Sequence, residues 1–414
     1  MPLLTQRARL PIQVLHVHTR LIRGGADENT LLTVNGLDPR RYQVALAVGG
    51  GSEAAMLAKV ASHVRLIEIP DMIREISPGH DLRAFQSLRR TIRAERFHIV
   101  HTHTAKAGIL GRFAARAAGK PLPDIVHTLH GSTFHDALGR APYVLYWGLE
   151  KASAAFTDRI ISVGEDLRAR YLQSGVGRPG QYRVIRSGMG LTEFAAASNL
   201  GAERRAGIRR SLGVPPDVPL VGKVARLERR KGHQYFLDMA ELILRRVPDA
   251  HFIGLGAGDE HTALIAEVER RGLAGRVLFP GFRQDIAEVL AVMDVVVLTS
   301  LWEGLPRVLV QAAACGVPAV TFAVEGAREI IHDGVNGWVV PIRDVNGLSD
   351  RVATLLLDPD RARAMGAAGR DLVRDAWTVE AMIRDIAAVY EELVARRASL
   401  AEEGERPAML ETDR

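Results

Sequence analysis

A carboxylate, an amide and two cations follow predicted strands in the second half of the chain. Glu303 comes after the apolar run VVVL and just before a Gly-Leu-Pro helix start, and Gln311 lies eight residues beyond it. Because eight residues are close to two helical turns, we expect both side chains to address one ligand. Arg226 and Lys231 follow the run LVGKV, where a guanidinium and an ammonium together suit a diphosphate. The alternative interpretation is a solvated basic loop with a surface acid and a core-facing amide.

Histidines and paired glycines occupy the matching positions in the first half. His130 ends the run IVHTLH and precedes a glycine and two hydroxyl residues, which makes it the best-placed histidine for work on a ligand. His103 ends the run HIVHTH, and Lys106 follows it at the start of a predicted helix. Gly24 and Gly25 also open a helix, where free N–H groups suit a phosphate. A tight turn with positive φ is an equally weighted explanation of the two glycines.

These residues predict neither a metal nor a cofactor. The histidines have no carboxylate between them at a ligand spacing, and we expect His16 and His18 to lie on opposite faces of one strand, where they cannot share an ion. Asp358 and Asp360 form a DxD pattern in a proline-broken turn, and we interpret them as surface residues. The GxGxxG fingerprint does not follow the first strand, which argues against a nicotinamide dehydrogenase.

The composition is that of a soluble globular protein with more than one domain. At ~150 residues per domain, the 414 residues correspond to two large domains or three small ones. Hydrophobic residues make up 47% and charged residues 25%, so the chain can build a substantial core. The net charge is 54 − 48 = +6, and only six of the 54 basic residues are lysines. This mild excess suits phosphates or an anionic membrane surface, and it is too weak to predict a nucleic-acid partner.

Cysteine content and the absence of targeting signals in the sequence favour the cytoplasm. The single cysteine, Cys315, cannot form an internal disulfide. Arg7 and Arg9 interrupt the N-terminal stretch where a signal peptide needs an apolar core. The most apolar long window, 286–302, contains two acids and is too short to span a membrane. We therefore expect any membrane association to be peripheral, on the inner face of the cell membrane.

One predicted helix, LRAFQSLRRTIRAERF, offers a surface for such an association. Four apolar residues form a stripe that arginines flank, namely Leu82, Phe85, Leu88 and Ile92. A basic amphipathic helix of this kind can rest on anionic lipid. We favour the simpler interpretation, in which it is an ordinary crossover helix with a basic solvent face.

Short apolar runs alternate with segments of helical spacing and predict thirteen buried parallel strands. The runs begin at residues 12, 44, 64, 98, 125, 159 and 182 in the first half, and at 220, 251, 276, 295, 319 and 338 in the second. Such strands belong to sheets that helices cover on both faces. The fold class is therefore predicted to be α/β, with two doubly wound, Rossmann-like domains.

The domain boundary is expected near the segment SGMGLTEF, where glycines follow the seventh strand. This places an N-terminal domain at 1–190 and a C-terminal domain at 191–376, followed by a helix over 377–397 and a polar, flexible tail over 398–414. The apolar face of that helix carries Met382, Ile386, Val389 and Leu393. Ligands of such sheets bind outside the carboxyl ends of the strands, so two facing domains would leave a cleft for them.

Several segments resemble the retaining glycosyltransferases of family 4, glycosyl transferases group 1. The most specific are WEGLPRVLVQAAACGVPAV, KVARLERRKG and RVIRSGMGLTEF, and RGGADE and HTHTAKAGILGR add to them. The resemblance extends from about Ile12 to Leu393. It implies the GT-B architecture, in which two Rossmann-like domains face each other across a cleft and the last helix returns to the first domain.

The resemblance also implies a nucleotide-sugar donor, UDP- or GDP-linked, and no metal. Glu303 would contact the donor sugar, while Arg226 and Lys231 would bind the diphosphate. Gln311 stands where the family has a second glutamate that holds the ribose hydroxyls. An amide there loses charge assistance of ~1 kcal/mol, so we expect weaker or altered nucleotide binding.

The resemblance also implies the remaining contacts to the donor and the residues on the acceptor side. Helix-start N–H groups at Gly304 and Leu305 would stabilise the departing diphosphate, over which Gly24 and Gly25 would close. The backbone at Phe282 and Arg283 would meet the base. His130 would act with Glu303 in catalysis by orienting the sugar or polarising a hydroxyl, and His103 and Lys106 are the acceptor-side candidates.

Relatives of this kind build cell-envelope polysaccharides on glycan or lipid-linked acceptors. The resemblance therefore implies a glycosyltransferase, an enzyme of the hexosyltransferase class, with such an acceptor as its second partner. Two alternatives remain open at this point. One is a nucleotide-sugar epimerase on the same fold, and the other is a non-catalytic nucleotide-sugar-binding protein, which Gln311 makes conceivable.

Overall fold

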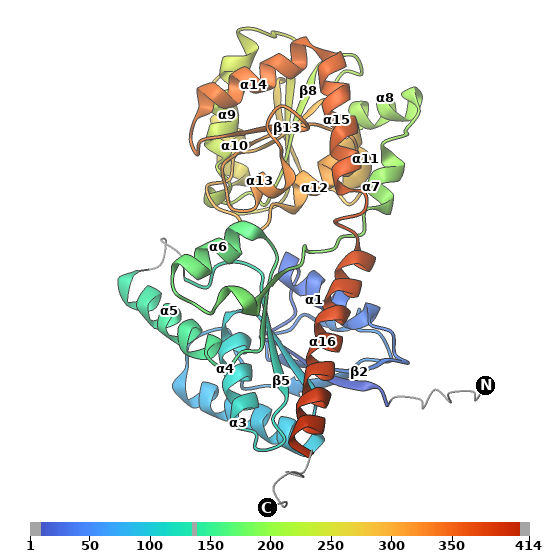
Figure 1. The fold of residues 1–414 in the computed structure, drawn as a ribbon. Helices are drawn as coiled ribbons and strands as arrows, with labels where there is room; N and C mark the ends of the chain where they lie inside the picture. Colours follow the sequence, from blue (N-terminus) through green and yellow to red (C-terminus); the bar gives the residue numbers. More distant parts are fainter. Residues whose placement is uncertain (1–9, 135–138, 406–414) are drawn as a thin grey trace, which may run out of the picture. The chain divides into compact units, whose positions relative to one another are not determined.

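The computed structural model describes residues 10–134 and 139–405, and the chain forms two compact units. The first unit consists of Met1–Val163, Leu167–Gly188 and Val379–Arg414, and the second of Gly164–Asp166 and Met189–Thr378. Each unit contains one parallel sheet with helices on both faces (Figure 1). The predicted α/β class with two doubly wound sheets is therefore confirmed.

The sheet of the first unit has seven strands in the order β3-β2-β1-β4-β5-β6-β7. Their bounds are β1 Ile12–His18, β2 Tyr42–Gly49, β3 Arg65–Ile69, β4 Ile99–His103, β5 Asp124–Leu129, β6 Arg159–Ser162 and β7 Tyr182–Val184. All pair in parallel. Val14, Leu15 and Val17 of β1 are all fully buried, because both faces of the sheet are covered.

Helices cover both faces of this sheet. One face packs against α1 (Gly25–Gly36) and α16 (Val379–Glu405), and the other against α3 (Pro78–Glu95) and α4 (Ala105–Arg116). The unit also contains α2 (Ala54–Leu57), α5 (Arg140–Ala154) and most of α6 (Glu165–Gln173).

The apolar stripe of α3 faces mainly inward. Leu88 and Ile92 are buried in the core and Phe85 packs against it, whereas Leu82 is 56% exposed. This packing agrees with the crossover-helix interpretation. None of the described helices combines the length and the apolar character that a membrane crossing requires.

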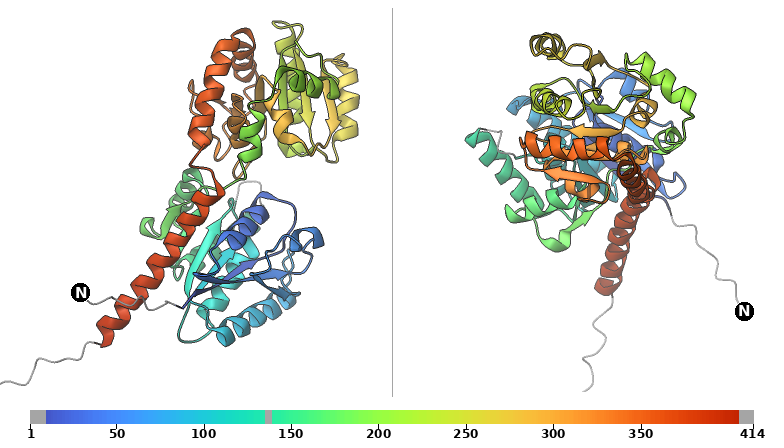
Figure 2. Two further views of the ribbon diagram at one scale, coloured as in Figure 1. Left: turned by 90° about the vertical axis from the view of Figure 1, so that its right-hand side faces the viewer. Right: turned by 90° about the horizontal axis from the view of Figure 1, so that it is seen from above.

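Helix α16 lies along the first unit (Figure 2). Its four stripe residues are buried in the core shared with α1 and the sheet, namely Met382, Ile386, Val389 and Leu393. The helix continues to Glu405, so the tail expected from residue 398 is wrong as far as 405. Ala, Leu and Glu are strong helix formers, and no proline interrupts them before Pro407. Residues 406–414, like 1–9 with Arg7 and Arg9, lie outside the described residues.

The second sheet has six strands in the order β10-β9-β8-β11-β12-β13. Their bounds are β8 Leu220–Val224, β9 His251–Leu255, β10 Val277–Gly281, β11 Val295–Leu298, β12 Ala319–Phe322 and β13 Gly337–Val340. The helices of this unit are α7 Thr192–Ala197, α8 Ala202–Ser211, α9 His233–Leu244, α10 His261–Arg270, α11 Ile286–Ala291, α12 Arg307–Ala314, α13 Ala327–Ile330, α14 Val345–Leu357 and α15 Pro359–Val373. One face packs mainly against α9, α10 and α14, and the other against α7, α8, α11 and α12.

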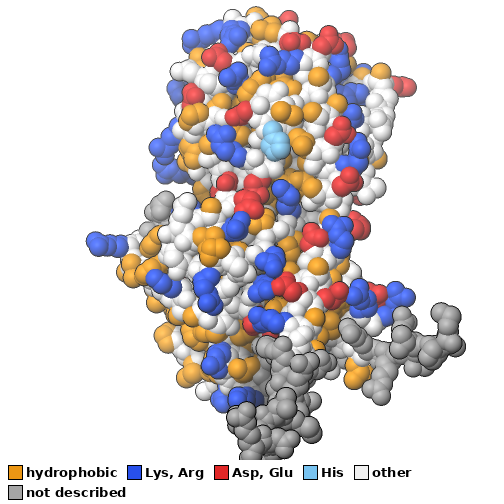
Figure 3. All heavy atoms as spheres, in the orientation of Figure 1, with side chains coloured by type: hydrophobic (Ala, Val, Ile, Leu, Met, Phe, Trp, Pro, Cys, Tyr) orange, Lys and Arg blue, Asp and Glu red, His pale blue; other side chains and the backbone are white. Residues whose placement is uncertain are grey.

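Strand order reverses once in each sheet, between β1 and β4 in the first and between β8 and β11 in the second. Open α/β sheets bind ligands at the carboxyl ends of the strands beside such a reversal. The arginines, in contrast, are dispersed: on the face seen in Figure 3, basic side chains alternate with acidic ones over both units. The residues that follow β1, β4, β8 and β11 are therefore the candidates for a ligand-binding site.

Candidate active site

Lys231 and Glu303 form a close ion pair at the carboxyl end of the second sheet. Lys231 lies in a short 3₁₀ helix after β8, and Glu303 lies in the loop after β11, so the pair stands beside the strand-order reversal. Lys231 Nζ is 2.6 Å from Glu303 Oε1, and the side chains are 12% and 11% exposed. The pair is reachable from solvent but largely desolvated, which strengthens its interaction with a ligand charge.

Lys223 holds this pair in place and was not among the residues selected from the sequence. It lies on β8, is fully buried, and donates to the carbonyl oxygen of Lys231 and to Oγ1 of Thr299. Burial, together with the charge of Lys231, lowers the pKa of Lys223 to about 7. The signal in the sequence was a lone lysine within the apolar run LVGKV.

Gly232 presses the same loop against the end of β11. Its φ of 62° lies in the left-handed region, and a Cβ atom would stand 2.1 Å from the carbonyl oxygen of Thr299. The Thr299 hydroxyl donates to the carbonyl oxygen of Gly232 at 2.8 Å. Only glycine permits this approach, which keeps Lys231 beside Glu303.

Helix α12 begins too late for Glu303 and Gln311 to share it. Its N-cap is Pro306, so Glu303 lies in the preceding loop, and the expected spacing of two helical turns is wrong. The N–H groups of Gly304 and Leu305 have no hydrogen-bond partner within the described part of the chain. Gln311 lies half-buried on α12, and its amide likewise has no partner among the described residues. These groups remain available to a ligand.

The side chains of Arg226 and Arg283, two further residues expected at the donor, form ion pairs with nearby acids. The side chain of Arg226 is 66% exposed and pairs with Glu228 at 2.8 Å, so no described contact joins it to Lys231 or Glu303. Arg283 donates twice to Asp285, at 2.8 and 2.6 Å. Phe282 follows β10 and is 60% exposed, so its ring is open to a stacking partner.

In the first unit, His130 and His103 are in contact at the carboxyl ends of β5 and β4. His130 Nε2 is 3.1 Å from His103 Nδ1. Burial lowers the pKa of His130 to about 3 and the pKa of His103 well below 6.5. Both rings are therefore neutral at pH 7. The Nδ1 atom of His130 has no partner among the described residues.

Lys106 is balanced by an acid. Its Nζ donates to Asp81 Oδ1 at 2.6 Å and to the carbonyl oxygen of Glu75, and the side chain is 10% exposed. The hydroxyls that follow His130 are also used, because Ser132 donates to Phe134 and Thr133 bonds to Tyr171. These contacts secure loops beside His130.

Gly24 is the N-cap of α1, and Gly25 is its first residue. The φ of Gly24 is −168°, so the explanation by positive φ is wrong for this glycine. A Cβ atom would lie 2.8 Å from Oδ2 of Asp27, whose Oδ1 accepts the N–H of Ile22 at 3.0 Å. The missing side chain therefore lets the Asp27 carboxyl fold back onto the loop, next to the position expected for a phosphate.

Three buried histidines meet inside the first unit. His16, His101 and His103 each place one ring nitrogen within 4.8 Å of the others, a spacing that could hold a metal ion. His16 and His18 do not lie on opposite faces of β1, because residues two apart in a strand share a face. Their ring centroids lie 5.2 and 6.1 Å from that of His103.

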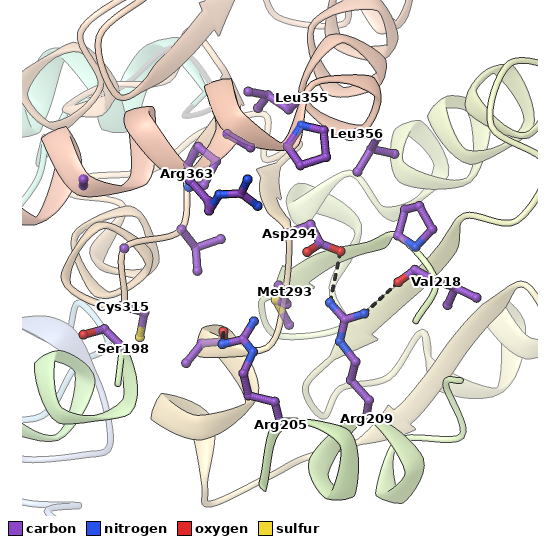
Figure 4. Close-up of a pocket in the computed structure, with 18 of the residues that line it drawn as sticks. Ser198, Arg205, Arg209, Val218, Met293, Asp294, Cys315, Leu355, Leu356 and Arg363 are labelled. Carbon is purple, nitrogen blue, oxygen red and sulfur yellow. Dashed lines mark hydrogen bonds and ion pairs between the residues drawn. The ribbon is translucent and has the colours of Figure 1, made fainter. Parts of the chain in front are cut away.

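A cavity of about 650 Å³ in the second unit lies away from the candidate site. It is lined by residues that precede β8, β11 and β12, such as Pro219, Asp294 and Pro318. Within it Arg209 bonds to Asp294 at 3.0 Å and to the carbonyl oxygen of Val218 at 2.7 Å (Figure 4). These residues lie at the amino end of the sheet, opposite the end that carries Lys231 and Glu303.

The DxD residues are structural. Asp358 caps α15 by accepting the N–H of Arg361 at 3.0 Å. Asp360 has a side chain that is 90% exposed and pairs with Arg363. Their interpretation as surface residues agrees with these contacts.

In comparisons with known proteins, each unit matches a glycosyltransferase family model. A model described as "Glycosyl transferase 4-like domain" matches residues 24–188, and one described as "Glycosyl transferases group 1" matches residues 205–372. The chain is 29% identical over 339 residues to the UDP-Gal:alpha-D-GlcNAc-diphosphoundecaprenol alpha-1,3-galactosyltransferase of Escherichia coli, covering 81% of this chain and 85% of that protein.

A second relative and a solved structure agree with this. The chain is 30% identical over 299 residues to the alpha-maltose-1-phosphate synthase of Mycolicibacterium smegmatis, covering 67% of this chain and 74% of that protein. The crystal structure of HepE from Anabaena in complex with UDP superposes with a TM-score of 0.76 at 21% identity, covering 92% of this chain and 100% of that one. At this identity the structure bears on the fold alone.

Proposed function

The chain belongs to the glycosyltransferases of group 1, family 4, with the GT-B fold, and on this premise we propose its reaction. It transfers a sugar from a UDP- or GDP-linked donor to a glycan or lipid-linked acceptor, with retention of the anomeric configuration and without a metal. The product belongs to cell-envelope polysaccharide synthesis.

The observation that carries this proposal is the Lys231–Glu303 pair beside the N–H groups of Gly304 and Leu305, which have no hydrogen-bond partner among the described residues. Cleavage of the bond between the anomeric carbon and the phosphate puts negative charge on the departing diphosphate. The ammonium of Lys231 and the two N–H groups are held in place before the reaction and stabilise that charge as it develops. Glu303, kept in position by Lys231, accepts hydrogen bonds from the sugar hydroxyls.

The relatives support the choice of substrates. The printed name of the E. coli protein gives a UDP-linked donor, a diphosphoundecaprenol-linked acceptor and an α linkage. The HepE structure contains UDP. A uridine nucleotide and a lipid-linked acceptor are therefore the first substrates to test.

The test is a transfer assay with the purified full chain. A thermal-shift screen against UDP- and GDP-sugars selects the donor, and NMR of the first product formed gives its anomeric configuration. We expect the configuration of the donor to be kept and the rate to be unchanged by EDTA. An inverted product would refute retention, and a rate that EDTA abolishes and Mg²⁺ or Mn²⁺ restores would refute metal independence.

The variant Gln311→Glu is expected to bind the selected nucleotide more tightly. A carboxylate accepts from both ribose hydroxyls with charge assistance, which is worth about 1 kcal/mol, or a roughly fivefold lower Kd. Isothermal titration calorimetry with the nucleoside diphosphate measures this. Gln311→Ala is the matched control and should bind more weakly than wild type. Equal affinity in all three proteins would show that residue 311 does not contact the nucleotide.

A further inference from the structure

A continuous chain of hydrogen bonds crosses the core of the first unit and ends at His130. It contains one threonine, one tyrosine and four imidazoles, in the order Thr128, His101, Tyr390, His16, His103 and His130. The successive distances between their side-chain atoms are 2.7, 2.5, 3.2, 2.9 and 3.1 Å. Thr128, His101, Tyr390, His16 and His103 are buried to within 3% exposure, and His130 is partly exposed.

Each ring in the chain uses both of its nitrogens except His130. His101 bonds through Nε2 to Thr128 and through Nδ1 to Tyr390. His16 bonds through Nε2 to Tyr390 and through Nδ1 to His103 Nε2. His103 then bonds through Nδ1 to His130 Nε2. The Nδ1 of His130 is the one ring nitrogen of these four histidines that has no partner among the described residues.

The number of protons allows only two arrangements. A neutral imidazole has one N–H donor and one acceptor nitrogen, and the Tyr390 hydroxyl has a single proton for its two nitrogen neighbours. The hydroxyl could accept from both nitrogens, but its own buried proton would then have no acceptor among the described residues, so it accepts from one neighbour and donates to the other. All links then point the same way along the chain. All four rings are then Nδ1–H tautomers, or all four are Nε2–H tautomers.

Thr128 selects between these arrangements. Among the described residues, the only partner of its buried hydroxyl is His101 Nε2, at 2.7 Å. If the hydroxyl donates, its proton is satisfied; if it accepts, its proton has no acceptor. A buried donor without an acceptor is costly, so the hydroxyl donates to His101. Every link then points toward His130, whose free Nδ1 carries a proton.

We propose that this network fixes the tautomer of His130, so that His130 presents an N–H donor, and not a lone pair, to the bound substrate. Tyr390, His16, His101, His103 and Thr128 are then positioning residues. The tautomer assignment stands on the first unit alone, and the contact with substrate rests on the proposed function. His130 in this state hydrogen-bonds an oxygen of the sugar or acceptor and does not act as the general base.

Metal binding is a competing use of the same rings. His16 Nδ1 and His103 Nε2 are 2.9 Å apart, a distance typical of a hydrogen bond with a proton between them. A zinc ion needs both lone pairs directed at itself at about 2.0–2.1 Å, with that proton removed. The hydrogen-bonded arrangement already satisfies these nitrogens. The hydrogen-bond network from Thr128 to His130, here called the relay, is therefore favoured over a bound metal ion.

The test reads the tautomers directly by NMR of the full chain with ¹⁵N-labelled histidine. Two-bond ¹⁵N–¹H couplings distinguish Nδ1–H from Nε2–H rings, and single His→Asn variants assign the signals. We expect Nδ1–H in all four rings of the wild type, by roughly tenfold or more over the other form. Uniform Nε2–H, tautomers that differ between the rings, or a stoichiometric zinc ion bound by the purified protein would overturn the proposal.

Tyr390→Phe interrupts the chain, and Tyr42→Phe is its matched control. The ring of Tyr42 lies 6.0 Å from that of Tyr390, but its hydroxyl bonds to Glu391 and not to a histidine. In Tyr390→Phe no hydroxyl sets the direction of the hydrogen bonds that join His16, His103 and His130, so His130 should show both tautomers. In Tyr42→Phe, His130 should keep the Nδ1–H tautomer. An unchanged His130 in folded Tyr390→Phe would refute the relay.

Activity separates this proposal from the proposed function. Because Tyr390→Phe interrupts the network, it should lower kcat of transfer about fivefold while KM for the donor stays within twofold. A changed tautomer with unchanged kcat would support the relay and refute the role of His130 in transfer. The NMR result does not depend on any substrate, so it judges the relay even if the donor assignment fails.

Discussion

Replacing Glu303 by alanine is expected to reduce kcat/KM for sugar transfer by at least about 100-fold, which corresponds to ~2.7 kcal/mol of transition-state stabilisation. Two effects add. The carboxylate that accepts from the sugar hydroxyls is lost, and Lys231 loses its partner at 2.6 Å in a largely desolvated position. Initial rates with the selected donor measure the effect, and a thermal melt shows whether the protein is folded.

Two variants sharpen this result. Glu303→Gln keeps the shape and removes the charge, so it should also lose most of the activity. Glu288→Ala removes a partly exposed acid of the same unit, which pairs with the exposed Arg204, and should change neither rate nor melting temperature noticeably. Full activity in folded Glu303→Ala would remove this residue from the active site.

Acid is expected to unfold the first unit well before the second. Burial lowers the pKa of seven histidines of the first unit, and the effect is strong for all of them except His98. The pKa is about 3 for His16 and His130, about 4 for His18, and well below 6.5 for His101, His103 and His127. Because the folded pKa lies below the unfolded one, the unfolded state takes up protons first as the pH falls. Stability is therefore full above pH 6.5 and decreases as the pH falls toward 4.

The expected loss is large. For each strongly shifted imidazole, the free energy of unfolding falls by about 2 kcal/mol between pH 7 and pH 5. The six strongly shifted rings together lower it by on the order of 10 kcal/mol, which is comparable to the whole stability of a domain. Two buried carboxyls, Asp27 and Asp124, have pKa values raised by burial and oppose this trend, but the imidazoles outnumber them. In the second unit burial lowers the pKa of His233 to about 4, which adds one ring of this kind there.

Hydrogen exchange of the full chain, corrected for intrinsic rates, tests this unit by unit. Protection of β1, β4 and β5 should collapse between pH 7 and pH 5, while protection of β8 and β11 changes far less. His18→Asn removes one ring that has no side-chain hydrogen bond in the described structure, and it should reduce the pH dependence by about 1.4 kcal/mol per pH unit. Equal protection of the first unit at both pH values would contradict the prediction.

Local patterns were enough to predict the strands and to place Glu303 and Lys231 at the carboxyl ends of strands in the second sheet. A run such as LVGKV is apolar because β8 is covered on both faces, so its position can be read without knowledge of its neighbours. Glu303 and Lys231 were identified because side chains that follow parallel strands gather at one edge of the sheet. The errors arose where local geometry was misjudged, as with the faces of His16 and His18 and the start of α12.

The pairings within the site could not be predicted in this way. Arg226 and Lys231 lie five residues apart after the run LVGKV, and the sequence gives no reason to expect different partners for the two cations. The fold separates them, because β8 lies beside β11 in the sheet. Gly232 and Lys223 hold the loop against Thr299 at the end of β11. Lys231 therefore contacts Glu303, which lies 72 residues away in the sequence. Arg226 instead pairs with Glu228.

The amino-acid sequence by itself therefore determined the α/β class, the two sheets, and which strand ends carry charge and imidazole, since these follow from short-range hydrophobic pattern. Only the tertiary structure decided which of those groups touch. Tyr390 reaches His16 across 374 residues because α16 packs on the sheet that holds β1, and a contact of that range leaves no periodic signal in either segment. The hydrogen-bond direction that we propose for His130 depends on that contact.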